Sequence, residues 1–338
     1  MARPGRRTNL ALLLLLGAAF GSGWLAFGTG TPAPAWIVTV LHGATGLGLL
    51  VLVPWKRVVV RRGFGRTVPL PGRWAGVGLG VLVGLSVVAG IAHVVLGPGT
   101  WFGLTALQVH VGSALLAVPL LVWHAAVRPQ RLRRTDFSRR NALRVLGLAA
   151  AAGGVYLTVE GAAALLRLPG HRRRATGSYE AGSGDPDAMP VTQWVADPVP
   201  LLPSDSWRLA VSDSAGTRTL SYVDIAAGTD TVRAVLDCTG GWYAEQEWRG
   251  VRLDRVLPGA RGAVDVVSAT GYRRRLPATD LPRLLLATHA GGVPLSAGHG
   301  APVRLVAPGR RGFWWVKWVV SVEVVDEPWW WQVPFPTQ

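Results

Sequence analysis

The chain has 338 residues, 49% of them hydrophobic, and a formal net charge of +16. The charge is uneven: residues 1–169 contain 17 Lys and Arg residues but only two acids, whereas residues 170–338 contain 18 basic and 17 acidic residues. An apolar, basic first half and a nearly neutral second half argue against a polyanion-binding protein, so we expect no nucleic-acid partner.

Five stretches of the first half are long and apolar enough to cross a membrane as helices. The first follows the basic start MARPGRR and has no clear small-residue cleavage site before Trp24, so we interpret it as a retained helix rather than a cleaved signal peptide. Residues 1–168 are therefore expected to form an all-α, five-helix transmembrane domain, multi-pass in the lipid bilayer of the cell membrane. The stretches are residues 9–27, 35–53, 74–96, 102–127 and 142–166.

The distribution of basic residues predicts the orientation of these helices. Lys and Arg gather at the N-terminus and in the loops WKRVVVRRGFGR and RPQRLRRTDFSRR, whereas the loops GTGTPAP and LGPGT carry no charge. Loops rich in Lys and Arg stay in the cytoplasm, and with five helices the three basic segments fall on one side. The N-terminus is therefore expected in the cytoplasm, and residues 170–338 outside it.

The segment TDFSRRNALRVLGLAAAAGG resembles a twin-arginine export signal, because Ser138, Arg139 and Arg140 precede an apolar run. That pathway carries folded domains, often with a cofactor already bound in the cytoplasm. An ordinary cytoplasmic basic loop explains the same arginines, so both interpretations stay open.

Four histidines fall within the apolar stretches: His42, His93, His110 and His124. Polar side chains inside a bilayer are costly and usually functional. His110 and His124 are 14 residues apart on one expected helix, which places them near one face, about 21 Å apart. This spacing resembles that of b-type cytochromes, in which one helix supplies ligands to two stacked haems, and neutral imidazole is a common haem ligand.

An outer haem b is better supported by these positions than an inner one. His42, His93 and His110 fall in the outer halves of their stretches, so His110 could share a haem iron with His42 or His93. His124 lies near the cytoplasmic end without an obvious partner. The alternative is that these histidines are interfacial or hydrogen-bonded within the bundle. Three nearby glycines would let a flat macrocycle approach the backbone: Gly43, Gly46 and Gly112.

After an expected linker over residues 169–189, the pattern changes to short β-branched runs separated by Gly, Pro and Asp. Residues 190–338 are therefore expected to form an α+β, β-rich domain. Short helices are expected around residues 251–257 and 279–287. The expected strands are WRLAV, VRAVLDC, VDVVSA, APVRLVAP and WVKWVVSVEVV.

The segment CTGGWYAEQEWRGVRLDRVL begins with Cys238, the only cysteine of the chain. It resembles the core segment of the sulfite-oxidase-type molybdopterin oxidoreductases, in which one cysteine at a strand end binds molybdenum. In the branch that contains the methionine sulfoxide reductases, tryptophans follow that cysteine by four and ten positions and a glycine by twelve. Trp242, Trp248 and Gly250 match this spacing.

A later segment, GGVPLSAGHGAPVRLVAPGRRGFWWVKWVVSVEV, resembles the second signature of the same family. The resemblance, which covers about residues 190–330, implies that His299, Arg304, Gly312 and Lys317 hold the pterin and its phosphate. A molybdenum–dithiolene centre suits a thiolate ligand, and a phosphate suits fixed cations. The alternatives are a small buried Cys238 and ordinary ion pairs for the basic residues.

The resemblance also implies which residues approach the reacting centre. Trp242 is expected near the metal, and Thr270 and Tyr272 of SATGY fall where the family approaches the cofactor pocket. Sulfite oxidases carry arginines just after the metal cysteine to bind an anion, but Gly240 and Gly241 stand there in this chain. A neutral oxo-donor such as a sulfoxide is therefore favoured, unless arginines from elsewhere refill the pocket.

The sequence predicts a membrane-bound molybdenum oxidoreductase with an extracytoplasmic molybdopterin domain. Electrons would pass between a membrane quinone or a redox protein and a small oxo-substrate, through haem b. One alternative keeps the molybdenum domain but has a haem-free anchor and a separate electron partner. Another is a non-enzymatic membrane receptor built on a decayed form of the fold.

Overall fold

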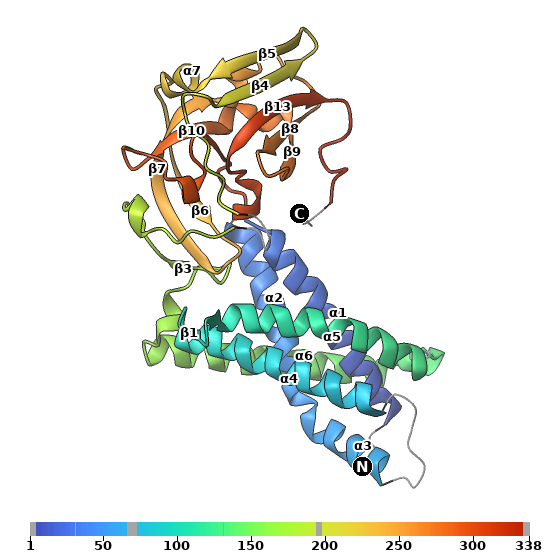
Figure 1. Cartoon of the computed structure of the whole chain (residues 1–338). Helices are drawn as coiled ribbons and strands as arrows, with labels where there is room; N and C mark the ends of the chain where they lie inside the picture. The colour runs from blue at the N-terminus through green and yellow to red at the C-terminus, as the bar shows by residue number, and fades with distance from the viewer. Residues whose placement is uncertain (1–4, 31, 66–72, 131, 194–197, 334–338) are drawn as a thin grey trace. The chain divides into compact units, whose positions relative to one another are not determined.

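The computed structural model describes residues 5–30, 32–65, 73–130, 132–193 and 198–333 (Figure 1). Arg3, Arg66 and Arg131 of the expected basic clusters lie outside these residues. The chain divides into two compact units, Met1–Phe27 with Pro32–Tyr179, and Gly28–Thr31 with Glu180–Gln338. The boundary falls between Tyr179 and Glu180, so the expected linker over residues 169–189 is shared between the two units.

Five long helices of the first unit lie where the apolar stretches predict them, within a few residues at each end. Each is long and apolar enough to cross a membrane. They are α1 (Arg6–Gly28), α2 (Pro32–Val51), α4 (Arg73–Leu96), α5 (Ala106–Val127) and α6 (Arg139–Leu165).

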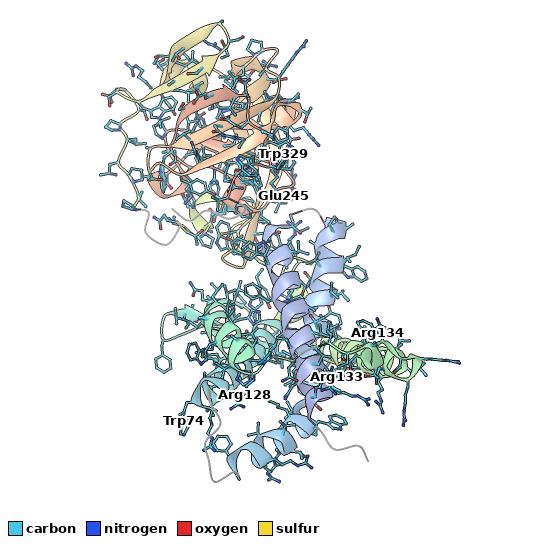
Figure 2. The ribbon with its side chains drawn as sticks, turned by 90° about the vertical axis from the view of Figure 1, so that its right-hand side faces the viewer. Trp74, Arg128, Arg133, Arg134, Glu245 and Trp329 are labelled. Carbon is cyan, nitrogen blue, oxygen red and sulfur yellow. The ribbon has the colours of Figure 1, made fainter. Side chains whose placement is uncertain are left out.

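The basic segments between these helices differ from simple loops. Much of WKRVVVRRGFGR forms an additional helix, α3 (Val53–Phe64), with Pro54 in its first turn, a position where the missing N–H of proline costs nothing. The segment between α5 and α6 carries Arg128, Arg133 and Arg134 (Figure 2). Ser138 caps the start of α6, so Arg139 and Arg140 form its first residues.

The helices of the first unit pack chiefly in two pairs, α4 along α5 and α2 along α6. Both acids of this unit are neutralised by arginine, because Asp136 pairs with Arg6 and Glu160 pairs with Arg173. A carboxylate paired in this way is far less costly in an apolar environment than a lone one.

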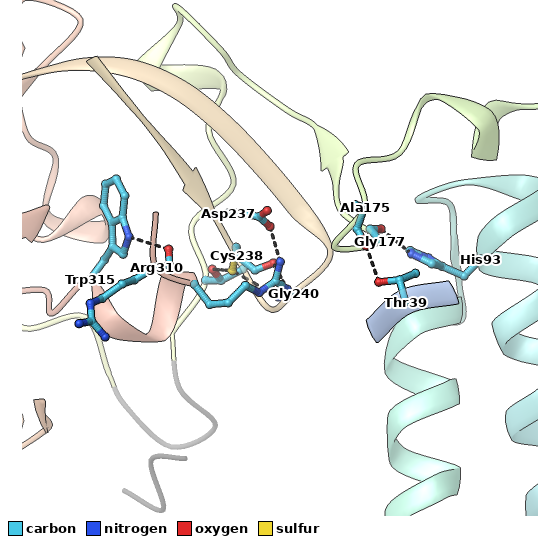
Figure 3. A network of polar contacts seen from close by, with 11 residues as sticks. Thr39, His93, Ala175, Gly177, Asp237, Cys238, Gly240, Arg310 and Trp315 are labelled. Carbon is cyan, nitrogen blue, oxygen red and sulfur yellow. Dashed lines mark hydrogen bonds and ion pairs between the residues drawn. The ribbon is translucent and has the colours of Figure 1, made fainter. Parts of the chain in front are cut away.

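Residues 169–179 belong to the first unit because their backbone bonds to its helices. The carbonyl of Gly177 accepts a hydrogen bond from His93 Nε2 at 2.8 Å, and that of Ala175 accepts one from Thr39 Oγ1 at 2.5 Å (Figure 3). The Tyr179 hydroxyl donates to the carbonyl of His93. Residues 180–189 instead bond to the second unit, through Ala181 N to Tyr243 O at 2.8 Å.

The second unit contains two β-sheets. The six-stranded sheet runs in the order β11 (Val293–Pro294), β10 (Leu285–Ala290), β7 (Trp242–Arg252) and β3 (Tyr179–Glu180), with β12 (Arg304–Val306) on β10 and β6 (Asp230–Asp237) on β7. The five-stranded sheet runs in the order β5 (Gly216–Ser221), β4 (Arg208–Asp213), β13 (Val319–Val325), β8 (Ala263–Ser268) and β9 (Arg273–Pro277).

One strand shows why this unit is β-rich. Along β7, the residues Trp242, Ala244, Gln246 and Trp248 are buried and alternate with more exposed neighbours, the period of two that a strand requires. Of the four described pairings in the five-stranded sheet, β4 with β13 is parallel and the other three are antiparallel.

Three sequence expectations for this unit need correction. The helix expected at 279–287 is a 3₁₀ turn (Ala278–Arg283) followed by strand β10, because Pro282 cannot donate the next helical hydrogen bond. The helix expected at 251–257 is only α8 (Leu253–Val256), since β7 continues to Arg252. The strand expected over WVKWVVSVEVV begins at Val319, because Trp318 has a left-handed φ of 53°.

Candidate functional site

Cys238 lies at the turn between β6 and β7. Its amide donates to the carbonyl of Trp242 at 2.8 Å, and its carbonyl accepts from the amide of Gly241 at 3.2 Å. Gly241 has a φ of +91°, which a side chain would oppose. The tight hairpin therefore fixes the backbone of Cys238 between Asp237 and Gly240 (Figure 3).

Two groups contact the Cys238 sulfur. The amide of Gly240 donates a hydrogen bond to Sγ at 3.3 Å, and Thr192 Oγ1 lies 3.3 Å from the same atom. Sequence reasoning missed Thr192, because it is 46 residues away and belongs to no motif.

Arg311 and Gly312 both contact the backbone of Cys238. Arg311 forms a buried ion pair with Asp237 at 2.5 Å and donates to the carbonyl of Cys238 at 3.3 Å. A Cβ on Gly312 would lie 3.0 Å from the Cα of Cys238, so Gly312 permits close backbone packing there. The sequence predicted Gly312 at the site but not the Asp237–Arg311 pair, which joins two distant segments.

Arg304 is a charged residue that is almost fully buried in the second unit. It is only 1% exposed, and its guanidinium lies near the rings of Trp248 and Trp315, 5.0 and 5.6 Å from their centroids. Nη1 donates to the carbonyl of His299 at 3.0 Å, and Nε has no partner among the described residues. Burial lowers the pKa of Arg304 to about 10, with the nearby Cys238 acting in the opposite direction.

His299 and Lys317 contact the same extended segment, residues 189–192. His299 Nε2 donates to the carbonyl of Met189 at 3.1 Å, and Lys317 Nζ donates to the carbonyl of Thr192 at 2.8 Å. Burial, and secondarily the positive charge of Arg304, lowers the pKa of His299. The second sequence motif is therefore linked to Cys238 through Thr192.

The remaining predicted site residues differ in their placement. Trp242 is 8% exposed, and its buried Nε1 has no partner among the described residues. The Tyr272 hydroxyl donates to the carbonyl of Phe313, directly after Gly312. Thr270 bonds to Ser268 within its own turn, at 3.2 Å.

In the first unit, the structure brings together two of the four histidines. His42 Nε2 and His110 Nε2 lie 3.4 Å apart. His42 Nδ1 donates to the carbonyl of Ala19 at 2.9 Å, and His110 Nδ1 donates to that of Ser86 at 2.8 Å.

The other two histidines point elsewhere. His93 donates its Nε2 proton to Gly177, so it does not join His110 as an alternative to His42. His124 packs against Gly76, where a Cβ would lie 3.0 Å from its ring. Within the described ranges, no three His, Cys, Asp or Glu residues form a cluster that could hold a metal ion.

One of the three expected glycines, Gly43, needs correction. A Cβ on Gly43 would meet the ring of Tyr156, and the glycines that lie against the two paired histidine rings are Gly23 and Gly90. Gly46 and Gly112 border open space.

Residues 196–331 match the family described as the oxidoreductase molybdopterin binding domain. This part of the chain is a molybdopterin-binding oxidoreductase domain. It is similar to mitochondrial sulfite oxidase of Rattus norvegicus, 31% identical over 169 residues that cover 38% of this chain and 31% of the relative. It is also similar to the catalytic subunit MsrP of the protein-methionine-sulfoxide reductase of Xanthomonas campestris pv. campestris, 27% identical over 146 residues that cover 36% of this chain and 45% of the relative.

Among solved structures, the sulfane dehydrogenase SoxCD from Paracoccus pantotrophus aligns with a TM-score of 0.36 and 24% identity, over 38% of this chain and 40% of that chain. The chain thus spans less than half the length of the curated relatives that it matches.

The residues of the molybdopterin-binding domain fit an anionic, thiolate-ligated cofactor. A buried guanidinium without a carboxylate is costly unless an anion joins it, and Arg304 has no acidic partner in the part of the chain that the structure describes. Cys238 would supply a thiolate of the kind that a molybdenum–dithiolene centre prefers. A phosphate-bearing group bound here would therefore supply a negative charge to balance Arg304.

Proposed function

We propose that this chain is a membrane-bound molybdenum oxidoreductase, with a transmembrane domain over residues 1–168 and an extracytoplasmic catalytic domain over residues 190–338. The observation that carries the proposal is the buried Arg304 cation, linked through His299, Lys317 and Thr192 to the only cysteine of the chain. Such an arrangement suits a cofactor that is anionic at one end and thiophilic at the other.

The residues have distinct roles in this proposal. Cys238 would ligate the metal, Arg304, Lys317 and His299 would bind the anionic end of the cofactor, and Thr270 would border its pocket. When bound, the molybdenum cofactor supplies a centre that exchanges an oxygen atom together with two electrons. Trp242 and Tyr272 are proposed to lie where a substrate would approach Cys238.

The charges around Cys238 favour a neutral substrate. Asp237 neutralises Arg311, which donates to the carbonyl of Cys238, through an ion pair at 2.5 Å, and the hairpin after Cys238 contains Gly240 and Gly241 rather than basic residues. We therefore propose reduction of a sulfoxide, which takes up two electrons and two protons and yields a thioether and water. The similarity to a relative named as a methionine-sulfoxide reductase supports this direction.

The membrane anchor is proposed from the surface of the first unit. Large apolar side chains are exposed on several helices, including Leu14 at 60%, Leu116 at 63% and Leu146 at 64%. Lipid acyl chains would cover such a surface without burying unpaired polar groups. The distribution of the basic segments supports an orientation with the N-terminus in the cytoplasm and the catalytic domain outside it.

Electrons are proposed to reach the site from a membrane quinone through a haem b held by His42 and His110. Each imidazole donates its Nδ1 proton to a carbonyl, which leaves an Nε2 lone pair for a metal. The two Nε2 atoms face each other at 3.4 Å. Two protein ligands suit an iron whose other positions a macrocycle fills.

The test is the molybdenum and iron content of detergent-purified chain, from a host that makes both cofactors. Cys238→Ser should lose molybdenum or sulfoxide reductase activity, because the thiolate ligand is gone. His110→Ala should lose iron and the haem absorbance band. His171→Ala, which changes an exposed histidine of the same unit, is the matched control and should keep both metals.

The possible results separate the alternatives. Molybdenum without iron in the wild type would leave a haem-free anchor that takes electrons from a separate redox protein. Folded wild-type chain without molybdenum would contradict the proposed enzyme and favour a receptor built on this fold.

A further inference from the structure

The Thr192 hydroxyl is placed to act on the Cys238 sulfur. Thr192 Oγ1 lies 3.3 Å from Sγ, and the Gly240 amide donates to the same sulfur at 3.3 Å. A thiolate bound to a metal has no proton to donate, so the hydroxyl must be the donor in the loaded protein. The sulfur would then accept two hydrogen bonds, one from the Thr192 hydroxyl and one from the Gly240 amide.

The segment that carries Thr192 is held in place at three points. His299 donates to the carbonyl of Met189 at 3.1 Å, and Lys317 donates to the carbonyl of Thr192 at 2.8 Å. Between them, Val191 packs so closely on Gly298 that a Cβ there would lie 2.8 Å from the valine methyl groups. The position of the hydroxyl is therefore determined by residues of the second motif.

We propose that Thr192 is a positioning residue, whose hydrogen bond to Cys238 Sγ raises the reduction potential of the bound metal. This inference rests on the proposed function. A hydrogen bond to a ligating sulfur withdraws electron density from it, so the sulfur donates less charge to the metal and the reduced state becomes more stable. Thr192 lies outside the matched range of residues 196–331, and no sequence motif indicated it.

The test compares four full-length proteins purified from a host that makes the cofactor: wild type, Thr192→Val, Thr192→Ser and Thr231→Val. Valine has the shape of threonine and lacks only the hydroxyl, whereas serine keeps the hydroxyl. Thr231 is an exposed threonine on β6 of the same domain and serves as the matched control. The measurements are molybdenum content and the reduction potential of molybdenum, followed by its paramagnetic signal during a redox titration.

We expect Thr192→Val to be reduced at a lower potential than wild type, and both Thr192→Ser and Thr231→Val to keep the wild-type potential. Loss of molybdenum from the valine variant alone would contradict this role, because the hydroxyl would then be needed to retain the metal rather than to set its reduction potential.

A molybdenum-loaded Thr192→Val protein with the wild-type potential would overturn the inference and leave the proposed function intact. A serine variant shifted as far as the valine variant would overturn it as well. Absence of molybdenum from the wild type would instead contradict the proposed function, so the two failures are distinguishable.

Discussion

The most informative single residue is Arg304. Its guanidinium lies near the rings of Trp248 and Trp315, and among the described residues its hydrogen bond goes to the carbonyl of His299. Burying a charge without an opposite charge lowers stability, and uncharged replacements of similar volume are often neutral or stabilising. Such a buried charge is useful where the protein must bind an anion. Its removal should therefore leave the stability unchanged or higher, while cofactor binding becomes weaker.

Arg304→Met should therefore separate the two effects. We expect the thermal unfolding midpoint of cofactor-free chain to stay within a few degrees of wild type or to rise, because the buried charge is removed. The molybdenum content should fall by about tenfold or more, since a hydrogen bond to a charged group contributes about 1.5–3 kcal/mol. Arg261→Met, at an exposed arginine of the same domain, should change neither quantity. Wild-type molybdenum content in Arg304→Met would show that Arg304 does not bind the cofactor.

At the scale of elements, the site depends on how the β6–β7 hairpin meets the segment after Arg310. A parallel bridge joins Asp237 to Arg311, and their side chains form an ion pair that is about 95% buried on both sides. Gly312 then packs directly on the backbone of Cys238. The pair thus connects the end of β6 to the second motif and fixes Cys238 relative to it.

Removing one partner of this ion pair should destabilise the fold more than removing both partners. Asp237→Ala leaves the Arg311 charge buried without its partner, which typically costs about 3–5 kcal/mol. The double variant Asp237→Ala/Arg311→Ala removes both charges and should unfold at a higher temperature than Asp237→Ala alone. The ordering is checked by thermal unfolding of the purified chain, with the exposed pair Arg233–Glu245 as a control expected to contribute about 1 kcal/mol or less. Equal midpoints for the single and double variants would contradict the buried-pair argument.

At the scale of the whole molecule, the chain couples an apolar helical unit to a molybdopterin-binding oxidoreductase domain. A metal cofactor bound in the cytoplasm would require export of a folded domain. Arg139 and Arg140 then have two possible roles, as a charge that keeps their loop inside or as an export signal. They begin helix α6 directly after the cap residue Ser138, and their charge alone does not distinguish the two.

Arg139→Lys/Arg140→Lys separates these roles because it keeps both charges. If the pair is an export signal, the double variant should leave the catalytic domain in the cytoplasm, protected from protease added outside the cell membrane. If only charge matters, the domain should remain as accessible to protease as in the wild type. Arg133→Lys/Arg134→Lys, in the same basic loop, is the matched control and should be exported normally in both cases.

Much of the fold was predictable from sequence because its signals are local. The five long helices follow from uninterrupted apolar runs, and strands β4, β6 and β8 follow from short β-branched runs. The helix expected at 279–287 was wrong because residues 284–287 form a short, continuous apolar run. A run of that length fits a buried strand as well as a helix. In the structure its residues 285–287 become part of strand β10 because they pair with β7 and β12.

The sequence by itself determined that Cys238 cannot form an internal disulfide, and it predicted that His299, Arg304, Gly312 and Lys317 bind one cofactor. Their spacing along the chain resembles a known family. Only the tertiary structure decided what lies beside the sulfur and the charges: Thr192 beside Sγ, Arg311 on Asp237, and Arg304 without a carboxylate among the residues that the structure describes. These contacts join segments far apart in sequence, and a hydrogen bond or an uncompensated charge depends on distances that no local pattern encodes.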